Sequence, residues 1–140
     1  MNIAITGEGI ISAIGTNKEE VLQSLLAHKS GIKEMQFLQS VHHELPVGEV
    51  ALSNEQMKKR LGIPEKQLMS RTELMGILAI RQALEDAGID LSAVSASNKE
   101  IVLVSGTTVG GMDLTEQSFN PLYEQFQSQQ ETKVEELAFL

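Results

Sequence analysis

The fold is decided by the stretch Glu100-Ile101-Val102-Leu103-Val104-Ser105-Gly106-Thr107-Thr108-Val109-Gly110-Gly111-Met112-Asp113. It begins with four consecutive apolar residues, three of which are β-branched. A run of this kind, with a charge before it and glycines after it, predicts a strand buried on both faces. Three glycines follow within six residues, so another segment or a ligand can approach the backbone closely. Open α/β sheets place their sites where such a strand ends and leads into a helix.

Capping signals predict two main helices before this stretch. Thr16 or Asn17 can cap the first helix, which is expected to end before Gly31. Ser70 and Glu73 form a capping box for a longer helix that ends before Gly88. The apolar residues of this second helix cover so much of its circumference that we expect it to be buried against more than one neighbour.

The remaining segments complete an alternating pattern. Short strands are predicted over residues 2–6 and 47–50, and one or two helical turns over residues 54–60. Residues 92–99 are expected to form a polar connection, and a further helix is expected over residues 113–127, with a possible restart at Pro121. Strands that alternate with helices argue for an α/β protein with a mainly parallel sheet and right-handed crossovers.

Composition excludes several classes of function. The chain has 140 residues, enough for one domain, and its net charge of −8 argues against nucleic acid as a partner. It contains no cysteine, which excludes a disulfide, a thiolate metal site or a cysteine nucleophile within these residues. No apolar run reaches the length of a membrane span and no signal peptide is recognisable, so we expect a cytoplasmic protein without a membrane partner.

The other candidate motifs are weak. Gly7 and Gly9 follow an apolar run, but Ser12 stands where a dinucleotide fingerprint needs its third glycine, so a close-packed turn is the main interpretation and a small nucleotide-binding module an alternative. His42 and His43 lack a ligand-spaced partner, so we expect a solvated loop and no metal site. The basic run over residues 58–60 is interpreted as a solvated face rather than a phosphate site.

Three stretches resemble the β-ketoacyl-acyl-carrier-protein synthases, a family of thiolase-like fold. They are residues 3–15, residues 25–32, and residues 83–89 continuing to residues 104–111. The order and spacing of these stretches carry the likeness, which extends to about Glu116. The resemblance implies the N-terminal part of an α-β-α layered fold in which a mainly parallel sheet is flanked by helices, and one incomplete N-terminal domain over residues 1–140.

The resemblance also implies an activity: decarboxylative Claisen condensation, which extends an acyl chain by two carbons in fatty acid or polyketide biosynthesis. It implies an acyl-carrier protein and acyl thioesters as partners of the parent protein, a homodimer or paired heterodimer, and no cofactor. The family's catalytic cysteine and histidines match no residue here, so the 140 residues alone are expected to be inactive. A non-catalytic subunit that resembles a chain-length factor remains an alternative.

One substrate-binding site is carried over from the family: Thr108, Val109, Gly110 and Gly111, in the glycine-rich turn. Val109 matches the bulky aliphatic residue that lines the family's acyl pocket, and a plain core position is the alternative. The apolar ending over residues 137–140 is interpreted as a chain cut from something longer. Such a piece is expected to expose apolar surface and to associate.

Overall fold

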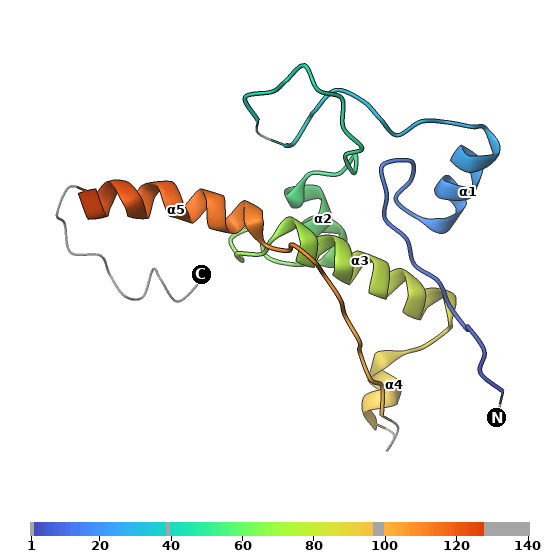
Figure 1. Ribbon diagram of the computed structural model, residues 1–140. Helices are drawn as coiled ribbons and strands as arrows, with labels where there is room; N and C mark the ends of the chain where they lie inside the picture. The colour runs from blue at the N-terminus through green and yellow to red at the C-terminus, as the bar shows by residue number, and fades with distance from the viewer. Residues whose placement is uncertain (1, 39, 97–99, 128–140) are drawn as a thin grey trace.

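A computed structural model describes residues 2–38, 40–96 and 100–127 of the chain. Within these ranges it contains five helices, which Figure 1 labels in chain order. They are α1 (Lys18–Leu26), α2 (Asn54–Leu61), α3 (Arg71–Asp86), α4 (Leu91–Ala96) and α5 (Met112–Gln127). Helix α3 lies at the centre, the N-terminal segment crosses it, and α5 extends away from the other helices (Figure 1).

The core lies between α2 and α3. Met57 of α2 and Leu74 of α3 are fully buried, and Leu78 and Leu52 are nearly so. Partly buried apolar side chains surround this cluster: Ile11, Val50, Leu61, Ile63, Met69 and Met75. The prediction that α3 is buried against more than one neighbour is therefore confirmed for Leu74 and Leu78 only, because Ile77 and Ile80 of the same helix are exposed.

The predicted helix starts are confirmed. The Asn17 side chain accepts a hydrogen bond from the backbone N–H of Glu20, 2.8 Å away, at the start of α1. Ser70 and Glu73 form the predicted capping box of α3. A second capping box, made by Ser53 and Gln56 at the start of α2, was not expected. Each cap satisfies backbone N–H groups that have no partner inside the helix.

The observed helix ends agree less well with those predicted from the sequence. Gly88 follows α3 with φ of 65°, as predicted. Helix α1, however, ends at Leu26, and His28 rather than Gly31 takes the left-handed conformation, with φ of 51°. Gly31 has a different role, because a Cβ atom there would crowd Ala13 and Ile14. The expected polar connection after Asp90 instead contains α4.

Helix α5 continues through Pro121 without the predicted restart. Phe119 and Tyr123, which flank the proline on one helix face, stack with ring centroids 5.8 Å apart. This contact spans the turn in which the proline removes a backbone hydrogen bond, and so favours one continuous helix.

The predicted sheet is not formed in the described residues, whose only β-type pairings are two isolated antiparallel bridges, Ser12 with Gly15 and Lys33 with Val47. The prediction that residues 101–104 are buried on both faces is wrong for this structure, because Val102 is 81% exposed and Val104 90%. Residues 3–5 are similarly exposed, and the predicted strand over 47–50 is only a bridge at Val47. A strand requires a neighbouring segment to accept and donate its hydrogen bonds, and in the described residues these three segments have no such pairing beyond the Lys33–Val47 bridge.

The N-terminal segment instead lies directly on the backbone of α3. A Cβ atom on Gly7 would overlap the carbonyl oxygen of Ala83, and one on Gly9 would overlap that of Ala79. The close packing predicted for this glycine pair is confirmed, but the turn is not, because residues 2–11 contain no turn and the reversal of the chain comes later, between Ser12 and Gly15. Because α3 occupies the space beside both glycines, the pair cannot cradle a phosphate in this structure.

We predict that Gly9→Ala lowers the free energy of unfolding by about 1–3 kcal/mol, because the methyl group forces the segment off α3. Gly76→Ala is the matched control, since Gly76 lies inside α3 with open space at its Cβ position. The control should raise stability by up to about 1 kcal/mol through helix propensity. Urea unfolding followed by far-UV circular dichroism measures both, and equal effects of the two substitutions would refute the close packing.

Candidate functional site

The glycine-rich turn that sequence analysis singled out lies at the N-terminus of α3. The Asp113 carboxylate, at the start of α5, accepts a hydrogen bond from the backbone N–H of Arg71 at 2.8 Å. A Cβ atom on Gly110 would lie 3.3 Å from the methyl group of Thr72. The turn is thus held where α3 begins, and Gly111 takes the positive φ of 81° that only glycine adopts without strain.

A cavity of about 770 Å³ opens next to this turn. Its walls come from residues 36–38, residues 47–50, the start of α2, and α5 from Asp113 to Asn120. Arg71 and Met75 of α3 complete the lining. The predicted site residues Thr108, Val109, Gly110 and Gly111 do not line this cavity, and the Val109 side chain is 68% exposed.

Arg71 joins three parts of this wall. Its Nη1 donates to the Leu52 carbonyl at 2.8 Å and to Asn54 Oδ1 at 3.2 Å, and its Nη2 donates to the Val50 carbonyl at 2.7 Å. The guanidinium also lies 5.4 Å from the centre of the Phe37 ring, within range of a cation–π contact. Through these hydrogen bonds the guanidinium holds residues 50–54 against α3.

Sequence reasoning missed Arg71, although one signal was present. A cation in the first turn of a helix opposes the helix dipole, so it needs compensation from elsewhere. Here the compensation comes from three oxygen atoms outside the helix and from acidic neighbours around the cavity.

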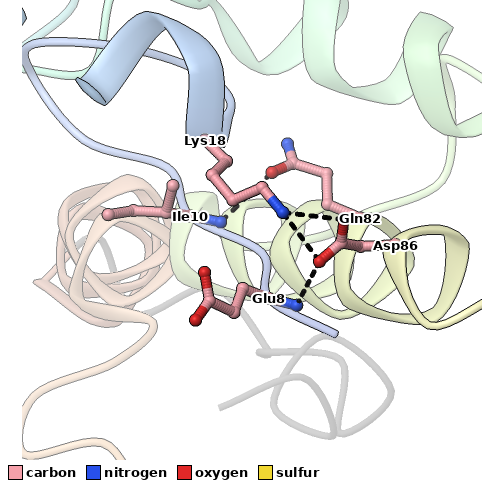
Figure 2. Close-up of polar contacts among 5 residues, drawn as sticks. All are labelled: Glu8, Ile10, Lys18, Gln82 and Asp86. Carbon is pink, nitrogen blue, oxygen red and sulfur yellow. Dashed lines mark hydrogen bonds and ion pairs between the residues drawn. The ribbon is translucent and has the colours of Figure 1, made fainter. Parts of the chain in front are cut away.

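A second polar cluster lies at the other end of α3, where Figure 2 shows Gln82 and Asp86 reaching towards the N-terminal segment. Asp86 Oδ2 accepts the Glu8 backbone N–H at 3.0 Å, and Gln82 Oε1 accepts that of Ile10 at 3.1 Å. Lys18 of α1 forms an ion pair with Asp86 at 2.7 Å. The cluster therefore joins α1 and the N-terminal segment to α3.

The spacing of this cluster explains its geometry. Gln82 and Asp86 are four residues apart, about 6 Å along a helix. Glu8 and Ile10 are two residues apart, about 6.6 Å along an extended chain. These two distances nearly match. Side chains on consecutive turns of α3 can therefore accept hydrogen bonds from alternate N–H groups of the N-terminal segment.

The contacts within this cluster shift the pKa values of Asp86 and Lys18. The hydrogen bond from Lys18 holds the pKa of Asp86 below its ordinary value of 3.8, and the Glu8 N–H adds to this effect. The same hydrogen bond raises the pKa of Lys18. Both side chains are exposed, so the pair is screened by solvent and positions the segment more than it stabilises the fold.

The histidines do not form a metal site in the part of the chain that the structure describes. His42 contacts the Glu44 carboxylate at 3.3 Å on the surface, and no group of three metal-ligating side chains lies together in residues 2–38, 40–96 and 100–127. In the basic run, Lys59 and Arg60 are exposed. Across the same ranges, no helix combines the length and the apolar character that crossing a membrane requires.

Comparison with known proteins assigns the family. The profile of the β-ketoacyl synthase N-terminal domain matches residues 1–138. The chain is 37% identical over 105 residues to 3-oxoacyl-[acyl-carrier-protein] synthase 1 of Haemophilus influenzae, a match that covers 74% of this chain and 25% of the relative. It is 35% identical over 107 residues to the Escherichia coli K12 synthase 1, covering 76% and 25% respectively.

A more distant relative supports the same assignment: synthase 2 of Coxiella burnetii is 28% identical over 123 residues, which cover 86% of this chain and 28% of the relative. No solved structure matched the chain. The chain belongs to the β-ketoacyl synthase N-terminal domain family, and the family resemblance expected from the sequence is confirmed. It spans about a quarter of the length of the curated relatives it matches. The family implies a thiolase-like α/β fold.

We predict that Lys18→Met raises the pKa of Asp86 towards 3.8, because the substitution removes the main hydrogen bond to the carboxylate. Since the folded-state pKa is depressed, the contribution of this pair to stability is present above 3.8 and is lost as the pH falls through the depressed value. Carboxyl carbon NMR titration measures the shift. Lys29→Met, which removes an equal charge elsewhere, should leave Asp86 unchanged; an equal shift in that control would contradict the assigned contact.

Proposed function

We propose that the chain is the N-terminal part of a 3-oxoacyl-[acyl-carrier-protein] synthase, an acyltransferase that extends acyl chains by decarboxylative Claisen condensation. The observation that carries this proposal is the family match over residues 1–138, supported by relatives that are named as such synthases. The relatives' names supply the partner, an acyl-carrier protein bearing acyl thioesters. We further propose a cytoplasmic location and a homodimer or paired heterodimer.

Residues 1–140 lack the nucleophile that the proposed reaction uses. Condensation through an acyl-enzyme needs a nucleophile, and the chain contains no cysteine to serve as one. We therefore propose that residues 1–140 are an incomplete N-terminal domain and that the nucleophile and its histidine partners belong to further polypeptide. In this proposal Val109, with Thr108, Gly110 and Gly111, lines the acyl pocket of the whole enzyme.

We also propose a layered fold of sheet and helices for the whole synthase. The apolar residues 2–6 and 101–104 have the composition of strands and no strand neighbour in this structure. We propose that they join a mainly parallel sheet, flanked by helices, when the rest of the synthase supplies their partners. Burial of these side chains would then supply the hydrophobic free energy that the isolated segments lack.

The activity is tested on the full gene product. We predict decarboxylation of a malonyl thioester and condensation with an acyl thioester by the full-length protein, and neither reaction by residues 1–140. Substitution of the nucleophilic cysteine in the continuation by alanine is the control for the full-length reaction. Absence of a cysteine at a strand–helix turn in the continuation would instead indicate a non-catalytic subunit similar to a chain-length factor.

The acyl pocket is tested separately. We predict that Val109→Phe in the full-length protein lowers kcat/KM for long acyl substrates by about tenfold or more, because the ring fills space that the acyl chain needs. Short acyl substrates should be affected much less. Val41→Phe, at a position 86% exposed in this structure, is the control. An equal loss for all chain lengths would place Val109 in the core rather than in the pocket.

The proposal that residues 1–140 are an incomplete domain can be tested by measuring their association. Residues 1–140 expose large apolar side chains along the N-terminal segment and residues 101–104, with Ile3 91% exposed. Exposed apolar surface of this kind favours association. We predict that multi-angle light scattering detects dimers or larger species of the 140-residue chain that dissociate on dilution, whereas a stable monomer would argue against the proposal.

A further inference from the structure

One carboxylate in the cavity wall has an unusual set of partners. Glu49 accepts hydrogen bonds from three consecutive backbone N–H groups: Gln36 at 2.8 Å, Phe37 at 3.0 and 3.1 Å, and Leu38 at 2.6 Å. Consecutive N–H groups that converge on one anion form a nest, an arrangement that proteins use to bind phosphate and carboxylate groups. Here the protein supplies the anion itself.

The surroundings of this nest favour a charged occupant. Arg71 lies over the Phe37 ring, so a guanidinium stands beside the segment that carries the three donors. Hydrogen bonds to an ionised acceptor are roughly twice as strong as neutral ones. Gln36, Phe37 and Leu38 are exposed, so their N–H groups can turn to water, but in the folded chain all three share one carboxylate as acceptor. The hydrogen bonds that place this segment therefore depend on the charge state of one side chain.

The position of Glu49 gives the contact a structural consequence. Backbone hydrogen bonds between Lys33 and Val47, at 2.8 and 3.0 Å, close the base of the segment between them. Glu49 lies two residues beyond that bridge and reaches back to residues 36–38, which form one wall of the cavity. No sheet hydrogen bonds hold residues 36–38 in the described chain, so the carboxylate takes the place of a neighbouring strand.

We propose that Glu49 and the backbone N–H groups of residues 36–38 form a charge-dependent latch that holds this wall of the cavity in place. The latch is closed when Glu49 is ionised. When Glu49 is protonated it becomes a weaker acceptor, and residues 36–38 separate from residues 47–50, which widens the cavity beside Arg71. The inference concerns the conformation of the cavity and does not depend on the proposed condensation activity.

The titration of Glu49 sets the pH at which the latch opens. Burial alone would raise the pKa of Glu49, but the three backbone N–H groups outweigh it, helped by the charge of Arg71, and the pKa lies below 4.5. Three other carboxylates line the same cavity: Glu55, Asp113 and Glu116. A depressed pKa means that the latch contributes stability above 4.5 and loses it as the pH falls through the folded-state value.

The test uses Glu49→Gln, which keeps the shape of the side chain and removes its charge. Glu116→Gln is the matched control, because it removes a carboxylate from the same cavity without touching residues 36–38. Amide hydrogen exchange at neutral pH is measured at residues 36–38 and, as a monitor of the fold, in α3. We expect exchange at residues 36–38 to accelerate about tenfold or more in Glu49→Gln while α3 is unchanged.

A second measurement follows the pH dependence directly. The amide NMR shifts of residues 36–38 in the wild-type chain should titrate together, with a midpoint below 4.5, and this titration should be absent from Glu49→Gln and kept in Glu116→Gln. Unchanged exchange at residues 36–38 in Glu49→Gln would overturn the proposal. So would a midpoint at or above 4.5, or equal acceleration in the Glu116→Gln control.

Discussion

Packing of Leu74 and Leu78 against Met57 and Leu52 is the contact on which the remaining structure depends. Each fully buried aliphatic side chain contributes about 1.5–3 kcal/mol relative to an exposed one, so this small cluster supplies a large part of the hydrophobic stabilisation. It fixes α3 beside α2, and residues at the two ends of α3 then contact other segments. Arg71 organises the cavity wall at one end, and Asp86 receives the N-terminal segment at the other.

Side chains replace sheet hydrogen bonds at several places in this protein. Gln82 and Asp86 accept alternate backbone N–H groups of the N-terminal segment, and Glu49 accepts three consecutive ones from residues 36–38. Backbone donors need partners wherever they leave water, and a side chain can supply one when no strand lies alongside. The contacts of Asp86 and Glu49 depend on the ionisation of single carboxylates, which makes the affected segments more sensitive to pH than a sheet would be.

The glycine-rich turn and the cavity lie close together but do not share lining residues. The glycine-rich turn, predicted as the site from its residues, lies where α3 and α5 begin and is held there by the Asp113–Arg71 contact. The cavity beside it could not be predicted, because its walls come from five segments spread between residues 36 and 120. Arg71 lies within a capping box, which predicts a helix start but not the partners of its side chain, and Glu49 lies in no recognisable motif. Their roles became visible only once their partners were located.

The sequence by itself determined the features that depend on near neighbours. Ser70 and Glu73 start α3, and Gly62 and Gly88 follow α2 and α3 with positive φ, because capping and left-handed turns involve residues within one helical turn of each other. Only the tertiary structure decided which apolar residues are buried. Residues 101–104 have the composition of a core strand, yet they are exposed, since burial and strand pairing require a partner segment that local sequence does not specify.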